Sequence, residues 1–318
     1  MSGLNRREFL TGSAAGLVLA GCVRRKAVPC EKLVSVVRRP DYTQELYSDL
    51  RRILSEYRLD VRGKRVLLKP NLVEFEPGSP INTHPLLVHA ALEAFRELGA
   101  DVMIGEGPGH RRNTLDMAEA AGYFETIPKF EEIFTDLNLD RATEVRLAHP
   151  QSRLQSIYLA QSAMSCDLLV SMPKMKTHHW VGATLSMKNL FGTVSGGVYG
   201  WPKNILHWAG IPGCIADLYK TLPAHFAIVD GIVGMEGNGP IQGTAKRAGV
   251  VVAGRDLAAV DASCCQIMGI DPHKIEYLKL AVGDVQGLVG SIHQIGEPVE
   301  SVRTRFDLLP EWSGLRQS

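Results

Sequence analysis

The sequence lacks the features that mark several classes of protein. Its six cysteines form no Cys-x-x-Cys pair, which excludes the spacing typical of iron–sulfur and zinc-ribbon sites. Lysine and arginine together number 35 and aspartate and glutamate 34, so the chain has no basic excess of the kind that nucleic-acid binding requires. The apolar run near the N-terminus is about a dozen residues, shorter than the roughly 20 that a membrane-spanning helix needs. We therefore expect no nucleic-acid partner and no internal iron–sulfur cluster.

The N-terminus resembles a bacterial export signal. A pair of arginines precedes the short apolar stretch, which ends in the sequence LAGC. Paired arginines are typical of twin-arginine signals, and LAGC resembles a lipobox, in which the cysteine is lipidated and becomes the new N-terminus. We predict a twin-arginine lipoprotein signal peptide at residues 1–21, a lipid on Cys22 and a tether at residues 22–32.

This leader predicts a location and two partners. The chain is expected to be a periplasmic or otherwise extracytoplasmic lipoprotein, exported by twin-arginine machinery and held at a membrane by acyl chains on Cys22. Twin-arginine signals resemble those of proteins that are exported already folded. Many such proteins take up a cofactor before export, so the leader also favours a bound metal or cofactor.

The rest of the chain alternates apolar runs with helical patterns. Strands are predicted at residues 33–38, 65–70, 101–106, 166–172, 226–232 and 249–254. Helices are predicted at residues 42–57, 85–98, 113–121, 204–221, 256–268 and 272–283. Nearly continuous apolar strands between helices indicate a mainly parallel α/β sheet with helices on both faces. We expect a single large domain over residues 33–318, with two intertwined lobes as the alternative arrangement.

Polar residues follow several of these strands, where ligands of open α/β sheets bind. Lys69 and Asn71 flank a proline after the second strand, and Glu106 follows the third in the sequence GEGPGH. Gly107 and Gly109 leave backbone N–H groups accessible to an anion. The segment does not match a phosphate-binding P-loop, however, so we predict an anion site without phosphate specificity.

The segment PKMKTHHWVGATLSMKNLFG gathers three lysines and two histidines after another apolar run. Lys174, Lys176 and His178 alternate, so they would share one face of an extended segment, and Lys188 and Asn189 follow. Such lysines repel one another unless an anion or acidic side chains lie between them. A solvated loop is the alternative, but the apolar residues among them favour partial burial, where lysines need partners.

Acidic residues elsewhere are the candidate partners or metal ligands. Asp230 and Glu236 lie in the sequence HFAIVDGIVGMEGNGPIQG, and Asp261 follows the last predicted strand. With Glu106, these oxygen ligands would suit a hard divalent cation such as Mg²⁺, Mn²⁺ or Ca²⁺. Adding His178 would shift the preference towards iron or zinc. We predict a divalent metal of unknown identity.

The order of these motifs resembles a known family. LLKPNLV, GEGPG, PKMKTHHWVGATLSMKNLFG, VDGIVGMEGNGPIQG and VVAGRDLAAVDA together are similar to the domain of unknown function 362. The resemblance implies an α/β fold. Some members carry ferredoxin-type four-cysteine modules, which this chain lacks. The family pattern falls on Lys69, Asn71, Lys174, Lys176, His178, Lys188, Asn189, Asp230, Glu236 and Asp261.

Three functions fit these residues. The first is a metal-dependent enzyme for a small anionic substrate, with Lys174 and Lys176 stabilising negative charge and His178 carrying a proton. The second is a non-catalytic lipoprotein that binds a metal or an anion. The third is an accessory subunit of an iron–sulfur redox system, whose redox partner supplies the clusters. In each, the expected anion ligands are Lys69, Asn71, Gly107, Gly109, Lys188 and Asn189.

Overall fold

A computed structural model of the protein describes residues 32–109, 113–223 and 225–317. The predicted signal peptide, Cys22 and nearly all of the predicted tether lie outside these ranges, so their structure is not discussed. Within them, no helix combines the length and the apolar character that crossing a membrane requires.

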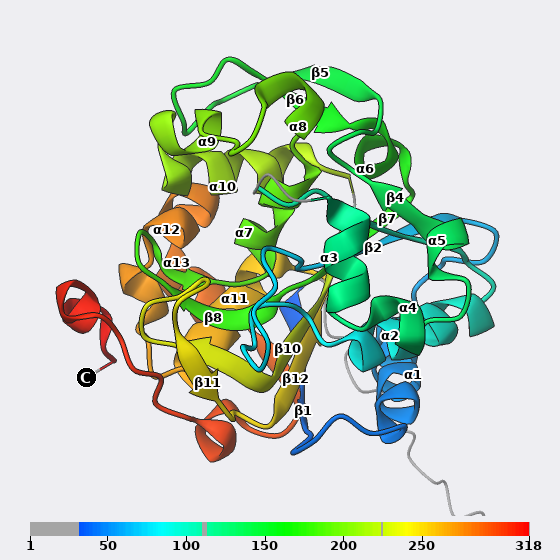
Figure 1. The fold of residues 1–318 in the computed structure, drawn as a ribbon. Helices are drawn as coiled ribbons and strands as arrows, with labels where there is room; N and C mark the ends of the chain where they lie inside the picture. The colour runs from blue at the N-terminus through cyan, green and yellow to red at the C-terminus, as the bar shows by residue number, and fades with distance from the viewer. Residues whose placement is uncertain (1–31, 110–112, 224, 318) are drawn as a thin grey trace, which may run out of the picture.

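Eleven strands of the described residues form one twisted sheet (Figure 1). In the order in which they lie side by side, the main strands are β13 (His293–Gly296), β1 (Leu33–Arg38), β12 (Val250–Gly254), β10 (His225–Glu236), β7 (Leu168–Met172), β2 (Arg65–Pro70), β3 (Asp101–Glu106) and β4 (Phe134–Asp136). Strand β12 runs antiparallel to both of its neighbours, and all other adjacent pairs along this order are parallel. The predicted mainly parallel sheet is confirmed.

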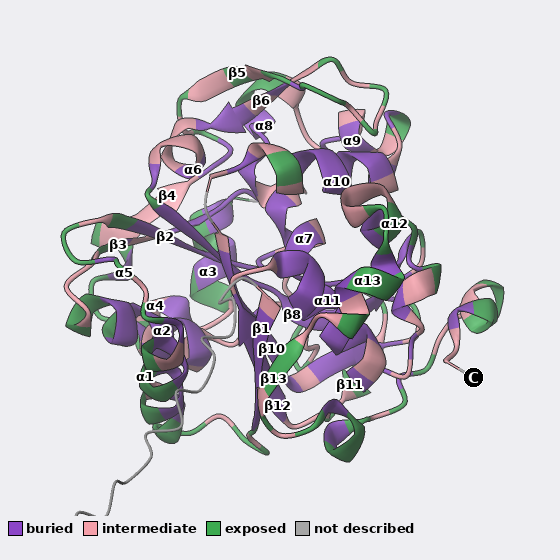
Figure 2. Ribbon diagram, turned by 180° about the vertical axis from the view of Figure 1, so that it is seen from behind, coloured by how far each residue is buried: buried purple, intermediate pink, exposed green. Residues whose placement is uncertain are grey.

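Helices cover both faces of this sheet, also as predicted. Alternate strand residues point to opposite faces, so Val34 and Val36 join one buried cluster and Leu33 and Val37 the other. The first cluster packs against α7 (Ser186–Asn189), α9 (Ile205–Trp208), α10 (Ile211–Thr221), α11 (Leu257–Ile267), α12 (Glu276–Val282) and α13 (Val285–Gly290). The second packs against α1 (Glu45–Tyr57), α2 (Pro85–Glu97), α3 (Thr114–Ala120), α4 (Tyr123–Thr126) and α5 (Phe130–Ile133). Figure 2 shows the buried sheet between these two layers.

Smaller elements complete the fold. A separate antiparallel pair is formed by β5 (Ala142–Arg146) and β6 (Ser156–Ala160). Short helices lie at α6 (Gln161–Ser165) and α8 (Gly196–Tyr199), and single 3₁₀ segments at Leu190–Thr193, Pro272–Lys274, Val299–Val302 and Pro310–Leu315.

Two predicted helices are divided in the structure. The helix predicted at residues 272–283 becomes the 3₁₀ segment Pro272–Lys274 and α12, and the helix predicted at residues 204–221 is also interrupted. The pattern over residues 204–221 predicts a continuous helix, but α9 ends at Trp208 and α10 begins at Ile211. Gly210 between them has a φ of 102°, which is outside the helical region and is readily adopted only by glycine. Pro212 then occupies the first turn of α10, where its missing N–H costs nothing.

Strand β10 is longer than predicted, and its extension beyond the carboxyl end of β7 pairs with further strands. It continues to Glu236 and pairs there with β8 (Lys174–His178) and β11 (Thr244–Lys246). Strand β9 (Gly182–Thr184) in turn pairs with β8. The pairing of β8 with β10 shifts register between Asp230 and Met235. This extension places the lysine-rich segment across the ends of the central strands.

Candidate anion-binding site

A cavity of about 350 Å³ lies at the carboxyl ends of β2 and β3, next to β8 and α7. Nine of the residues predicted from the sequence contribute to its wall. They are Lys69, Asn71, Glu106, Gly107, Gly109, Lys176, His178, Lys188 and Asn189. Among the described residues of the wall there are four lysines, the fourth being Lys203, against a single carboxylate. The cavity is therefore built with an excess of positive groups.

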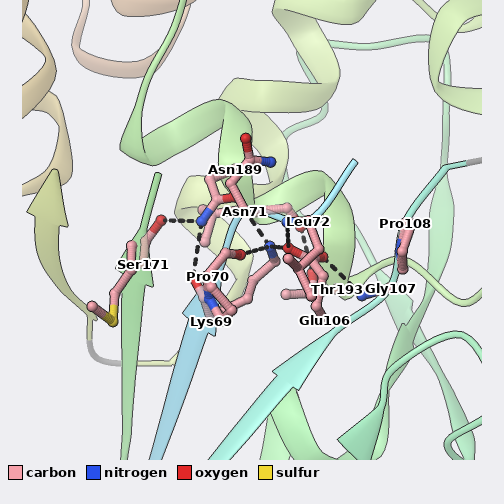
Figure 3. A network of polar contacts seen from close by, with 12 residues as sticks. Lys69, Pro70, Asn71, Leu72, Glu106, Gly107, Pro108, Ser171, Asn189 and Thr193 are labelled. Atoms are coloured by element: carbon pink, nitrogen blue, oxygen red, sulfur yellow. Dashed lines mark hydrogen bonds and ion pairs between the residues drawn. The ribbon is translucent and has the colours of Figure 1, made fainter. Parts of the chain in front are cut away.

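The single carboxylate of the wall is already paired. Lys69 Nζ lies 2.7 Å from Glu106 Oε2, and both side chains are almost wholly buried, with 1% and 2% exposed. Lys69 also donates to Asn189 Oδ1 at 3.1 Å, and the Asn189 amide donates back to Lys69 O at 3.0 Å and to Ser171 Oγ at 3.1 Å (Figure 3). This network joins β2, β3, β7 and α7, so it fixes the floor of the cavity.

The same network explains a glycine. A Cβ on Gly192 would lie 1.9 Å from Glu106 Oε1 and 2.5 Å from Lys69 Cε. Gly192 therefore lets the chain after α7 pass directly over the buried ion pair, which a larger residue would displace.

Lys176 lies in the wall without a carboxylate partner among the described residues. Its side chain is fully buried, and Nζ donates to Ile81 O at 2.9 Å and to Pro240 O at 3.3 Å. Burial lowers the pKa of Lys176 well below its usual value, and the charges of Lys188 and Lys174 lower it further. A nearby anion would reverse this shift, because it would stabilise the ammonium form.

Lys188 is less restrained than Lys176. Within the described part of the chain its ammonium group has no hydrogen bond or ion pair, and Nζ lies 4.6 Å from the centre of the Phe191 ring. Burial, with a smaller contribution from the charge of Lys69, lowers the pKa of Lys188 to about 8. Lys188 thus lies in the cavity wall with a pKa close to neutral pH.

His178 is held as a neutral imidazole. Nδ1 accepts the Trp180 N–H at 2.9 Å, which places the ring proton on Nε2. Burial lowers the pKa of His178 strongly, and the charges of Lys188 and His179 add to the shift. His178 can therefore donate a hydrogen bond from Nε2 into the cavity without bringing a charge.

Two wall residues, Lys203 and His207, were not predicted from the sequence. Lys203 Nζ donates to Gly107 O at 2.7 Å, and burial lowers the pKa of Lys203 to about 7. His207 Nδ1 is buried without a hydrogen-bond partner in the described residues. Lys203 lies in the irregular segment before α9, and His207 lies in α9 itself, where no strand end marks them. The sequence WPKN, with a lysine beside a proline as in KPN, was the available signal.

The predicted glycine donors are only partly free. The Gly107 N–H donates to Glu106 Oε1 at 2.8 Å, so it serves the buried carboxylate rather than an external anion. Gly109 lies in the wall, and a Cβ placed on it would meet nothing within 4 Å.

The four acidic residues predicted to bind a metal are not brought together. Asp230 pairs with Lys174 at 2.7 Å and accepts hydrogen bonds from the Tyr42 hydroxyl and the His84 N–H. Lys174 is thereby directed away from the cavity wall, although it shares a face of β8 with Lys176. The acidic and basic motifs therefore do meet at Asp230 and Lys174, but they form a buried ion pair and not a metal site.

Glu236 and Asp261 are engaged at separate places. Glu236 pairs with Lys246 at 3.0 Å and accepts the Asp307 N–H. Asp261 accepts the N–H groups of Ser186 and Met187 at the start of α7. Burial raises its pKa to about 7 despite these bonds. Across the described ranges, no three His, Cys, Asp or Glu side chains are placed to hold one metal ion.

Comparison with known proteins places the chain in a family. The sequence model for "Domain of unknown function (DUF362)" matches residues 66–266. The thylakoid-associated protein sll1697 of Synechocystis sp. (strain ATCC 27184 / PCC 6803 / Kazusa) is 30% identical over 222 residues, which span 67% of this chain and 65% of that protein.

A solved structure is more distantly similar. The lactate racemase apoprotein from Thermoanaerobacterium thermosaccharolyticum has 13% sequence identity and a TM-score of 0.46, with 74% of this chain and 57% of that chain covered. This similarity is too low to support an argument about function. The DUF362 model covers most of the described sheet and the motifs that form the cavity wall. The chain belongs to the DUF362 family.

Proposed function

We propose that the cavity binds a small organic anion, carrying a carboxylate or a phosphate, and that the protein acts on this anion as an enzyme. The observation that carries the proposal is the presence of Lys176 and Lys188 in the wall with no carboxylate partner among the described residues. Buried cations are ordinarily paired, because removing a charge from water without a counter-ion is costly. A bound anion would supply the missing partner.

The carbon part of the ligand would meet an aromatic wall. Trp180 and His207 pack edge to face with ring centres 4.9 Å apart, and Phe191 lies beneath the Lys188 amine. Lysines on one side and rings on the other favour a ligand with one charged end and one flat or apolar end. Either a carboxylate or a phosphate would suit the lysine side of the cavity as the charged end of the ligand.

The catalytic part of the proposal rests on proton-active groups beside the lysines. Neutral His178 would orient the ligand through its Nε2–H, and Lys203, whose pKa is about 7, would exchange a proton near neutral pH. The divalent metal predicted from the sequence would need ligands that the four separated carboxylates do not supply together. The proposal therefore takes no step through a metal.

Anion titration at several pH values tests the proposal. Oxalate and sulfate keep a constant charge between pH 6 and pH 9, so only the protein titrates. We expect saturable binding by calorimetry at pH 6. Affinity should weaken about tenfold for each ammonium lost as the pH rises past the pKa values of Lys203, about 7, and Lys188, about 8. Acetamide, which is uncharged, is the control ligand. Absence of saturable binding of both anions at pH 6, or affinity that rises with pH, would contradict the proposal.

We further propose that the protein works as an extracytoplasmic lipoprotein anchored through Cys22. The LAGC sequence supports this location, and the cyanobacterial relative is named for its association with a membrane system. Expressed in a bacterium with a twin-arginine pathway, the chain should incorporate labelled palmitate and sediment with membranes. Cys22→Ala should remove both properties. Membrane association that persists without the label would show that another part of the chain provides the anchor.

A further inference from the structure

We propose that Lys188 is a nucleophile, and that its amine forms an imine with the carbonyl carbon of a small 2-oxo acid bound in the cavity. This inference rests on the proposed anion-binding function and names its substrate class. A 2-oxo acid carries a carboxylate for the unpaired cations and, on the adjacent carbon, a carbonyl group for the amine.

The geometry distinguishes Lys188 from the other lysines of the wall. Lys69 is paired with Glu106, and Lys176 and Lys203 each donate to backbone carbonyl oxygens. Within the described ranges, Lys188 alone among these four has no hydrogen bond to its amine. Its lone pair becomes available once the amine loses a proton, whereas the other three are directed at fixed partners.

The backbone that carries Lys188 is firmly placed. Asp261 receives the Ser186 and Met187 N–H groups at 2.8 and 3.2 Å, which anchors the start of α7. Asn189, the next residue after Lys188, is bound to Lys69 and Ser171. A short helix fixed on both sides of a free amine is the arrangement expected when a reactive side chain must be presented at one point.

The electrostatics support the same role. Burial, with a smaller contribution from the charge of Lys69, keeps the pKa of Lys188 at about 8, so about a tenth of the amine is neutral at pH 7. Lowered pKa values of this kind activate lysine amines towards carbonyl groups. Lys176 and the other cations remain to hold the carboxylate of the same ligand.

The proposed step balances without an oxidant or a reductant. The neutral Lys188 nitrogen attacks the carbonyl carbon and forms a C–N bond, while the C=O π bond breaks and the oxygen takes up one of the two amine protons. The resulting hydroxyl group then leaves with the remaining amine proton as one water molecule, which gives the C=N bond. Once protonated, the imine withdraws electrons from the neighbouring carbon, and hydrolysis returns the amine and the carbonyl compound.

Reductive trapping tests the inference. The protein is incubated with glyoxylate and sodium cyanoborohydride, and the product is examined by intact mass and peptide mapping. With glyoxylate at saturating concentration, we expect one reduced adduct per chain on the peptide that contains Lys188, forming faster as the pH rises through about 8. Excess oxalate should suppress it by occupying the cavity. Lys129→Met, which removes an exposed lysine, should trap glyoxylate as the parent protein does.

Lys188→Arg separates the two proposals, because it keeps a cation and removes the nucleophile. We expect this variant to bind oxalate and to form no adduct above the level of surface lysines. An adduct that persists in Lys188→Arg, or one spread over exposed lysines, would overturn the inference. If the parent protein binds oxalate but traps no glyoxylate, the imine is wrong and the anion site stands. If it does neither, both proposals fail.

Discussion

Lys69→Met is expected to lower the free energy of unfolding by about 3–5 kcal/mol, because it leaves the Glu106 carboxylate buried without its counter-ion. The two groups lie 2.7 Å apart, and both are almost inaccessible to water. Of its partners among the described residues, Glu106 would keep the N–H groups of Leu72 and Gly107, at 3.2 and 2.8 Å. Chemical denaturation followed by circular dichroism would measure the loss.

A double variant identifies the cause of this loss. In Lys69→Met combined with Glu106→Gln, neither position carries a charge, so the double variant should be more stable than Lys69→Met alone. Lys129→Met, in which an exposed ion pair is broken, should leave the unfolding midpoint unchanged. If Lys69→Met and Lys129→Met had the same stability, the buried pair would not be the element that fixes the cavity floor.

Lys176→Met is expected to weaken oxalate binding by about tenfold to a hundredfold, because a hydrogen bond to a charged group contributes roughly 1.5–3 kcal/mol. Unlike Lys69, this lysine has no carboxylate that would be left behind among the described residues. Its removal should therefore cost far less stability than Lys69→Met. Calorimetric titration at pH 6 and chemical denaturation of the same preparations would measure both effects.

The contrast between the two lysines is the control within this experiment. Both lie in one cavity wall, but one is expected to act on stability and the other on binding. Oxalate affinity that is unchanged in Lys176→Met would show that the anion does not reach this side of the cavity. A loss of stability as large as that of Lys69→Met would show that the side chain supports the fold instead.

Most of the sheet could be predicted from the sequence because its signals are local. Apolar runs of five or six residues that end in glycine, proline or a polar residue mark β1, β2, β3, β7 and β12. Each predicted strand lies within about two residues of an observed one, except that β10 continues to Glu236. The extension depends on pairing with β8 and β11, which a local pattern does not contain.

The cavity wall was predictable for a related reason. The carboxyl ends of parallel strands meet at one edge of a sheet, so polar residues after β2, β3 and β7 were expected to converge. Lys69, Glu106 and Lys176 line one cavity. Lys203 comes from a loop and His207 from α9, neither of which follows a strand, and only the tertiary structure brings them to the wall.

The choice of partners was decided by the tertiary structure. The sequence shows that buried lysines need anions, but it does not say which acid lies beside which lysine. Register places Asp230 beside Lys174, and the two side chains lie 2.7 Å apart. Lys69 and Glu106 reach one another at 2.7 Å from the adjacent strands β2 and β3. Both acids are therefore paired within the protein. Lys176 and Lys188 remain without such a partner in the described residues.

The sequence by itself thus determined the α/β class, the strand ends that carry the polar residues, and the membership in the DUF362 family. These follow from periodicity and from motif order, which are properties of neighbouring residues. The tertiary structure decided which charges are neutralised inside the protein and which are left facing a cavity. That distinction depends on distances between residues far apart in the chain, because the energy of two buried charges is set by their separation and their access to water.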